Sequence, residues 1–265
     1  MYSKKGYAYA DANPVSQLND EDRTVDLSIE VDKGKKVYVG NIELLGNLKT
    51  RDNVIRREFR LKEGELFDGS KLKRSKQRIN NLNFFEDVKI DTSRGKDPDL
   101  IDILTTVTEK PSGSFSVGAG FSSVENVIFS TSVAQNNLFG NGQRLSLGAQ
   151  LSSIRKDFNL SFTEPRLLDS EILMGLDAFN TNQQFFSFNS QTTGGGFRLG
   201  KNMSEYDTVN VRYRYDNVEV SNVTARNQTD TLKNETRVTS RVAPTYTYDS
   251  RDNFLNPSEG WRHMV

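Results

Sequence analysis

Residues able to perform chemistry are sparse in this chain of 265 residues. There is no cysteine, which excludes disulfides, thiolate metal sites and a cysteine nucleophile. His263 is the single histidine, and although Asp249 and Asp252 precede it, a metal site needs several converging ligands. We therefore predict that His263 is a strand or interface residue, and we assign no metal ligand, cofactor-binding residue or catalytic residue.

The glycines do not form the loops that bind phosphates or expose a nucleophile. The sequence has no G-x-S-x-G elbow and no G-x-x-x-x-G-K-[ST] loop. Gly118, Gly120, Gly140 and Gly142 lie in strand or hairpin context, which does not fit a dinucleotide-binding turn. We therefore expect a protein that is not an enzyme and needs no cofactor.

Three basic clusters, Lys33–Lys36, Arg56–Arg57 and Lys71–Arg78, could bind nucleic acid or anionic lipid. Acidic residues are equally abundant in the same half of the chain. The charges of Lys71–Arg78 also surround a helix whose Leu72 and Ile79 are predicted to be buried. We therefore interpret this cluster as the solvated face of a helix and expect no nucleic-acid partner. The alternative is that the cluster lies near anionic lipid headgroups.

One turn combines charge with backbone-shaping residues. It contains Asp249, Arg251, Asp252, Asn253, Pro257 and Gly260. Asn, Pro and Gly are the residues that a tight connection requires. We predict a structural hairpin turn here.

The elements that position these residues fall into two regions of different charge. Of the first 111 residues 41 are charged, against 29 of the remaining 154. The change falls at Pro111-Ser112-Gly113, which we predict to be a domain boundary. No apolar run approaches the roughly 18 residues of a membrane helix, but membrane strands need only about 9–11 alternating residues.

From Ser112 onward the sequence alternates between apolar and small or polar residues. The stretch 114–122 places Phe115, Val117, Ala119 and Phe121 on one face and nothing larger than Ser on the other. This pattern is typical of membrane β-strands with lipid on one side. We predict nine strands, near 113–122, 126–136, 143–152, 156–164, 171–180, 191–200, 207–219, 236–249 and 260–265.

A soluble β-sandwich is the alternative, because its strands also alternate. Against it stand the repeated Gly and Ser on the small face and the aromatic residues Tyr246, Tyr248 and Trp261 near strand ends, where membrane interfaces place them. Arg212 and Arg214 would each cost a few kcal/mol in lipid and must face inward. An open membrane sheet would leave unpaired edges in hydrocarbon, so we expect further strands to close it.

The region 37–110 reads as a small α+β unit in the order strand, helix, helix, strand, strand. Thr50 is the expected N-cap of the first helix and Asp68 opens the second. Residues 88–92 and 101–108 supply the closing strands. Ahead of this unit, Tyr7–Ala10 and Thr24–Val31 alternate around a turn-rich 13–22, which suggests the last two strands of a preceding copy.

These residues closely resemble the BamA family of outer-membrane protein assembly factors. Tyr38-Val39-Gly40-Asn41-Ile42, Gly46-Asn47 and Asn81–Val88 resemble a POTRA domain of that family. Asn137–Gln143, Leu160–Leu168 and Asp249–Asn253 resemble its barrel motifs in the right order. The resemblance implies that 1–36 end the fourth POTRA domain, that 37–110 are the fifth, and that 112–265 are the first half, about nine of sixteen strands, of an antiparallel transmembrane β-barrel.

The resemblance implies a bacterial outer-membrane location with the POTRA domains in the periplasm. It also implies unfolded outer-membrane protein clients, the lipid bilayer, Bam lipoproteins and periplasmic chaperones as partners. We expect clients to add to an exposed POTRA edge strand formed by Val88, Lys89, Ile90, Asp91 and Thr92. We expect the first barrel strand to act as a lateral gate that pairs weakly with the last strand and templates clients, through Gly113, Ser114, Phe115, Ser116, Val117, Gly118, Ala119, Gly120 and Phe121.

Two other functions fit the same architecture. A secretion pore of the same superfamily would pass its substrate through the lumen, and a porin-like channel would not need POTRA units. Because there is no signal peptide and the closing strands of the family are absent, we expect the sequence to be part of a longer protein.

Overall fold

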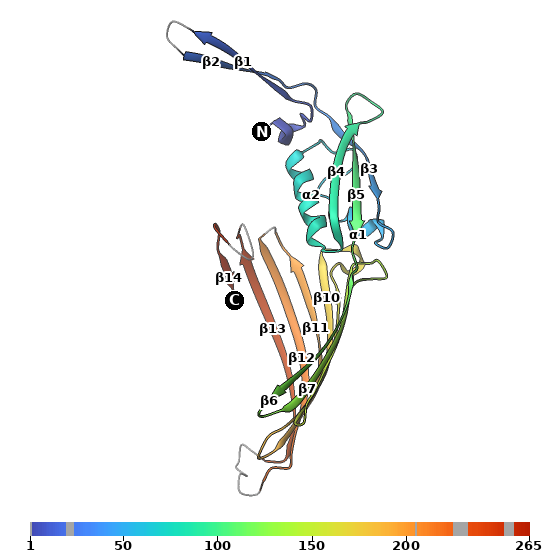
Figure 1. The fold of residues 1–265 in the computed structure, drawn as a ribbon, viewed down its shortest axis with the longest axis vertical. Coiled ribbons are helices and arrows are strands. Elements are labelled where there is room, and N and C mark those ends of the chain that lie inside the picture. The colour runs from blue at the N-terminus through green and yellow to red at the C-terminus, as the bar shows by residue number, and fades with distance from the viewer. Residues whose placement is uncertain (1, 20–23, 205, 225–232, 252–256) are drawn as a thin grey trace. The chain divides into compact units, whose positions relative to one another are not determined.

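A computed structural model describes residues 2–19, 24–204, 206–224, 233–251 and 257–265 (Figure 1). The chain divides into two compact units, Met1–Lys110 and Pro111–Val265. Among the described residues, no helix has both the length and the apolar character needed to cross a membrane.

The first unit is α+β. Its elements are η1 (Tyr2–Lys5), β1 (Asp11–Asn19), β2 (Thr24–Asp32), β3 (Tyr38–Leu45), α1 (Asp52–Arg56), α2 (Gly69–Asn81), β4 (Phe85–Arg94) and β5 (Leu100–Glu109). The strands after residue 37 form a sheet in the order β3-β5-β4. Central β5 runs parallel to β3 and antiparallel to β4. The predicted order of strand, helix, helix, strand, strand is confirmed.

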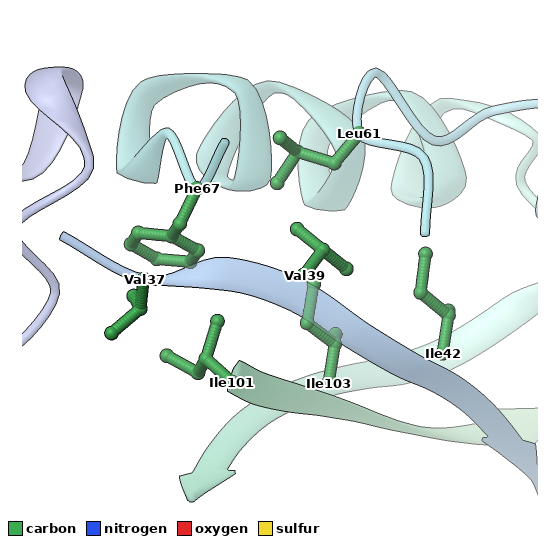
Figure 2. Packing of buried hydrophobic residues seen from close by; sticks show 7 residues of the cluster. All are labelled: Val37, Val39, Ile42, Leu61, Phe67, Ile101 and Ile103. Atoms are coloured by element: carbon green, nitrogen blue, oxygen red, sulfur yellow. The ribbon is translucent and has the colours of Figure 1, made fainter. Parts of the chain in front are cut away.

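Two clusters of buried apolar side chains hold this unit together. One joins β3 and β5 to the segment before α2, through Val37, Val39, Ile42, Leu61, Phe67, Ile101 and Ile103 (Figure 2). The other joins both helices to β4 and β5, with Val54, Ile55, Ile79, Phe84, Phe85, Val88 and Val107. Together they bury one face of the sheet.

The helix starts agree only partly with the prediction. Asp68 is the N-cap of α2, and its Oδ1 accepts hydrogen bonds from the backbone N–H groups of Ser70 and Lys71. The prediction of Thr50 as the cap of α1 is wrong, because Arg51 holds that position without a side-chain cap bond. The backbone N–H of Thr50 instead donates to Glu109 at the end of β5.

The prediction for the first strand of the preceding hairpin is wrong. The structure forms β1 from Asp11–Asn19, where a turn was predicted, and Tyr7–Ala10 are not in a strand. Ala8 packs against the first apolar cluster, and the backbone oxygen of Gly6 accepts from the N–H of Val37. Pro14 suggested a turn, but it lies in a two-stranded hairpin, where an edge position tolerates proline.

The second unit is one antiparallel sheet of nine strands joined in sequence order. Its strands are β6 (Gly113–Ser122), β7 (Asn126–Leu138), β8 (Gln143–Leu151), β9 (Arg155–Glu164), β10 (Ile172–Gln184), β11 (Asn189–Asn202), β12 (Asp207–Ser221), β13 (Glu235–Asp249) and β14 (Arg262–Met264), with η2 (Leu167–Asp169) before β10. All nine predicted strands are confirmed. β10 and β11 extend beyond their predicted limits, to Gln184 and from Asn189.

The strand register sorts the side chains of this sheet into two faces. Phe115 lies in one row with Val133, Leu147, Leu160, Ala178, Gly195 and Tyr215. We call the face that carries this row the apolar face. The opposite, polar face carries Ser114, Ser146, Ser161, Asp177, Arg214 and Arg241.

The band of large apolar residues slopes across the apolar face. On β6 it begins at Phe115, whereas on β12 it ends at Tyr215, in the same row. The band thus shifts by about six residues, or ~20 Å, across six strand spacings of ~4.8 Å. This slope corresponds to a strand tilt of roughly 35°, which is the range of strands in membrane barrels.

Candidate functional site

The predicted client-binding residues lie on a sheet edge. β4 pairs with β5 alone, so its other side is an edge of the three-stranded sheet. Val88 is buried in the core beneath α2, while the side chains of Lys89, Asp91 and Thr92 are exposed. The fold therefore anchors β4 through one face and leaves its outer backbone available.

The opposite edge of the same sheet is already occupied. The N–H of Val39 donates to the oxygen of Glu65 at 2.8 Å, and the N–H of Phe67 donates to the oxygen of Val37 at 3.0 Å. Farther along β3, the N–H of Ile42 donates to Glu63. Sequence reasoning did not find this cover, because irregular segment 63–67 has no strand pattern.

The outer backbone of β4 makes no such contacts to the described chain. The N–H of Gly95 donates to the oxygen of Leu100 on β5. Because backbone groups alternate along a strand, the N–H and C=O groups of the odd-numbered residues of β4 point toward β5. The N–H groups of Ile90 and Thr92 therefore point to the free edge. Of the two edges of this sheet, β4 is the one left open to an added strand.

The predicted gate residues form β6, an edge strand of the nine-stranded sheet. β6 pairs with β7 alone. Phe115, Val117 and Phe121 are 71%, 69% and 77% exposed, so little of the described chain covers them. The N–H of Asn136 donates to the oxygen of Ser112, and the alternation from this bond points the backbone of the odd-numbered residues outward.

Glycine gives β6 a face with almost no packing. A Cβ added at Gly120 would meet nothing within 4 Å, and one at Gly118 would meet only the Oγ of Ser130, at 2.8 Å. Glycine inside a strand loses more conformational freedom on ordering and has no side chain to pack. β6 is therefore held by its backbone bonds to β7 more than by side-chain contacts.

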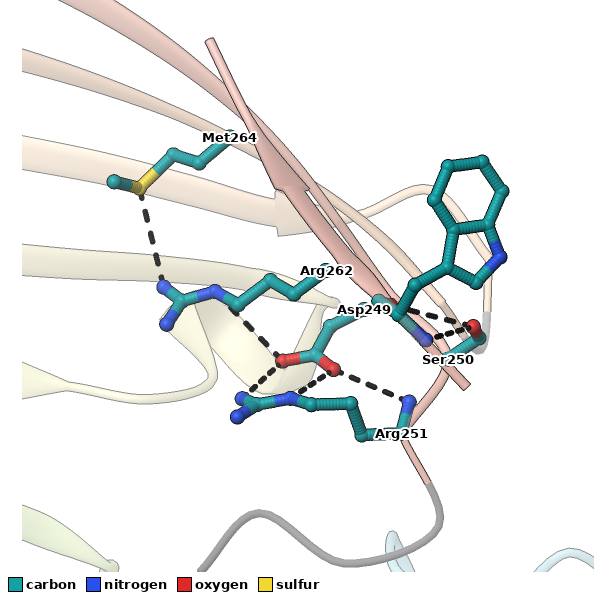
Figure 3. Close-up of polar contacts among 6 residues, drawn as sticks. Asp249, Ser250, Arg251, Arg262 and Met264 are labelled. Carbon is teal, nitrogen blue, oxygen red and sulfur yellow. Dashed lines mark hydrogen bonds and ion pairs between the residues drawn. The ribbon is translucent and has the colours of Figure 1, made fainter. Parts of the chain in front are cut away.

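The described residues of the charged turn bind one another. Arg251 donates from Nε and Nη2 to the two carboxylate oxygens of Asp249, at 2.8 and 2.7 Å, and Arg262 lies 3.8 Å from the same carboxylate (Figure 3). The N–H of Ser250 donates to the oxygen of Trp261. These contacts pin the two ends of the β13–β14 connection together.

The rest of the turn motif contributes backbone shape. Gly260 has φ +88°, and a Cβ there would lie 2.3 Å from the oxygen of Ser250. Pro257 is exposed and lies outside any strand. Asp252 and Asn253 lie outside the described residues.

Aromatic side chains gather where β12, β13 and β14 approach this turn. The ring centroids of Tyr248 and Trp261 are 5.7 Å apart, and those of Trp261 and His263 are 4.3 Å apart. Tyr206 lies 6.1 Å from Tyr248. His263 thus packs edge-on against an aromatic neighbour, and no group of three or more metal-ligating side chains occurs among the described residues.

The polar face carries two charged clusters. In the first, the Nε of Arg198 lies 2.9 Å from Asp177, whose Oδ1 also accepts from the hydroxyl of Ser161. In the second, Asp216 is only 5% exposed and accepts from Arg214 at 2.7 Å and from Arg241 at 2.8 Å. The charged residues of these two clusters are thus paired on the face opposite to the apolar band.

Comparison with known proteins agrees with both units. A family model for the Omp85 superfamily domain matches residues 137–265, and a POTRA model, described as a surface antigen variable number repeat, matches residues 37–110. The chain is 33% identical to the outer membrane protein assembly factor BamA of Nitratidesulfovibrio vulgaris over 260 residues, covering 98% of this chain and 33% of that protein. It is 35% identical to the BamA of Neisseria meningitidis over 213 residues, covering 77% of this chain and 27% of that protein.

A solved structure shares the fold. The crystal structure of BamA from Haemophilus ducreyi lacking POTRA domains 1–3 matches with a TM-score of 0.76 and 23% identity, covering 100% of this chain and 54% of that chain. The architecture is thus that of an outer-membrane β-barrel protein with a periplasmic POTRA domain. The chain belongs to the Omp85 superfamily and, within it, to the BamA family. It spans about a third of the length of the curated relatives it matches.

Proposed function

We propose that this chain assists the assembly of β-barrel proteins into the outer membrane, by offering unfolded clients two strand edges in turn. The observation that carries the proposal is that β4 and β6 each pair with a single neighbouring strand, so that the outer backbone of each is open to an added strand. The names of the BamA relatives support the same role.

The first edge receives the client in the periplasm. An extended segment adds to β4 through main-chain hydrogen bonds, which do not depend strongly on its sequence. Exposed Lys89 and Asp91 limit unwanted pairing between copies of the chain, as charges on edge strands do. We propose that 1–36 belong to a preceding POTRA domain.

The second edge acts within the membrane. We propose that in the whole protein β6 pairs weakly with the closing strand, so that the seam opens sideways and β6 templates a client strand. Unpaired backbone groups in hydrocarbon cost several kcal/mol each, which favours rapid pairing once a client arrives. Client folding and burial in lipid supply the driving free energy, so the process needs no nucleotide and no catalytic residue.

The partners follow from this role. Clients are unfolded outer-membrane proteins, delivered by periplasmic chaperones, and Bam lipoproteins bind the periplasmic part. Nucleic acid is not a partner. The lysines of α2 and Arg74 are exposed to solvent, and two of the helix's cations have acidic partners: Lys71 pairs with Glu65, and Arg78 pairs with the buried Glu58.

Photo-cross-linking in cells tests the proposal. A benzophenone amino acid is placed at Asp91 on β4, at Val117 on β6, or at Ser146 on the polar face. We expect newly made barrel clients to cross-link at Asp91 and Val117 but not at Ser146. Substrate cross-links confined to Ser146 would instead indicate transport through the lumen and would contradict the proposal.

A disulfide provides the second test. Linking Ser114→Cys on β6 to a cysteine in the last strand of the whole protein closes the seam, and the chain described here contributes no competing cysteine. We expect client insertion to stop under oxidising conditions and to recover after reduction. Unimpaired insertion with the seam locked would rule out the lateral gate.

A further inference from the structure

The apolar face contains a hollow that the proposed function does not use. It has a volume of about 500 Å³ and crosses β7 to β11. One wall is the row Val133, Leu147, Leu160 and Ala178. The other is the neighbouring row that runs from Thr131 through Ala149 to Thr193.

The hollow exists because small side chains interrupt a surface of larger ones. Ala149 and Ala178 lie between Leu147, Leu160 and Phe158, and Gly148 and Gly194 lie in the floor. These large side chains are 41% to 48% exposed, so they stand clear of the sheet. The result is a groove with apolar walls on the face that contacts lipid.

The β10–β11 end of the groove carries a hydrogen-bonded polar pair, whereas the β7 end carries the single hydroxyl of Thr131. The Nδ2 of Asn180 donates to the Oγ1 of Thr193 at 2.6 Å. The hydroxyl of Thr193 accepts this bond and keeps its own hydrogen for another acceptor. Toward the β10–β11 hairpin, Asn180 is the next residue on the apolar face of β10 after Ala178, and Thr193 is the next on that of β11 after Gly195.

The connectivity gives the groove a direction in the membrane. The periplasmic POTRA domain joins the start of β6, so the β10–β11 hairpin at 185–188 lies at the opposite, outer end of the strands. Asn180 and Thr193 therefore mark the outer margin of the apolar band. Leu147 and Ala149 lie near the middle of β8, so the other end of the groove reaches toward the membrane centre.

We propose that this groove binds one acyl chain of an outer-leaflet lipid, with the polar end of that chain at Asn180 and Thr193. The groove crosses four strand spacings of ~4.8 Å, or ~19 Å, and because the rows of the sheet are inclined by roughly 35° it descends ~11 Å into a hydrocarbon core of ~30 Å. The occupant is a lipid because the groove is continuous with the lipid-facing surface. In hydrocarbon the selectivity comes from close packing and the polar contact, since burial of apolar area gives no advantage there.

The test uses the whole protein in vesicles of dimyristoyl phosphatidylcholine with a trace of photoactivatable phosphatidylcholine. A diazirine near the chain terminus should label the region of Leu147 and Ala149, and one near the ester should label the region of Thr193. Labelled peptides are identified by mass spectrometry. Two results with the natural protein would overturn the proposal. One is uniform labelling over the apolar face, and the other is labelling of Thr193 by the terminal diazirine and of Leu147 and Ala149 by the one near the ester.

Variants that fill the groove provide the second arm. Ala149→Phe and Ala178→Phe, made separately, should each reduce the labelling of the groove about tenfold, because the added ring occupies the space of the acyl chain. Val238→Phe, on the same face but outside the groove, should leave it unchanged. Equal labelling in all three variants would contradict the proposal, and it would leave the two-edge function unaffected.

Discussion

The Nη2 of Arg56 donates to the backbone oxygen of Ile42 at 2.7 Å. This side chain, from the end of α1, thereby occupies an acceptor on the outer edge of β3. Glu63 takes the donor of the same residue, and the segment 64–67 pairs with β3 beside it. The POTRA sheet consequently has one closed edge and one open edge, and the client binding that we propose would use the open one.

Removing the arginine should loosen the closed edge. Arg56→Ala leaves the oxygen of Ile42 without this charged donor, and we expect the local opening free energy of β3 to fall by about 1–2 kcal/mol. Hydrogen exchange measured by mass spectrometry over 38–45 checks this. Arg74→Ala is the control, because the exposed side chain of Arg74 binds Gln77 on its own helix. Equal exchange in both variants would show that the Arg56 contact does not protect β3.

Proline should block the open edge without damaging the sheet. Thr92→Pro removes an N–H that points away from β5, so no ladder bond is lost, and proline is tolerated on edge strands. We expect client cross-linking at Asp91 to fall at least about threefold, the result of removing one net hydrogen bond. Thr92→Ala keeps the N–H and should bind like the natural chain. If both variants behave alike, β4 does not add client strands.

Acid should weaken the contact between the segment before α2 and the helix itself. The hydrogen bond from Lys71 holds the pKa of Glu65 below its ordinary value of 4.5. A lowered carboxyl pKa contributes stability above the ordinary value, and this contribution is lost as the pH falls through the folded-state pKa.

Hydrogen exchange over 62–72 checks this prediction, after correction for intrinsic rates, between about pH 6 and about pH 3. We expect protection to decrease below pH 4.5 in the natural chain. Glu65→Gln, which cannot titrate, should lack this additional loss. The same pH profile in both proteins would assign the effect to other groups.

The charged cluster on the polar face should stabilise the sheet. Asp216→Ala leaves Arg214 and Arg241 as neighbours without their shared carboxylate, and we expect the free energy of unfolding to fall by about 2–3 kcal/mol. Urea unfolding from lipid vesicles measures the change. Glu219→Ala, exposed on the same strand, should cost less than about 0.5 kcal/mol. Similar costs for the two variants would contradict a structural role for Asp216.

The periodicity of apolar residues predicted the strands, because each strand buries or exposes one face as a whole. The alternation of Phe115 to Phe121 located β6, because membrane strands must segregate large apolar side chains. Asp68 was found as a helix cap because its side chain is the cap. The edge position of β4 was expected from the resemblance to POTRA domains, which have an exposed sheet edge.

Contacts that depend on tertiary geometry were not predictable. The bond from Arg56 to Ile42 and the pairing of Glu65 with Val39 join segments without a repeating pattern. The N-cap of α1 is Arg51, and the N–H of Thr50 before it binds Glu109, which is distant in sequence. The lipid groove required the register of five strands, since Ala149 and Ala178 become neighbours of one hollow only across the sheet.

The free backbone of β6 is the centre of the account, and a single proline tests it most directly. Ala119→Pro removes an outward-pointing N–H and no bond to β7, whereas Ala119→Val keeps that N–H with a similar side-chain size. Assembly of a barrel client into vesicles that contain the whole protein is then measured as the rate at which folded client appears. We predict that Ala119→Pro slows assembly at least about tenfold and that Ala119→Val leaves it within about twofold. Equal rates for the two variants would show that clients do not pair with β6.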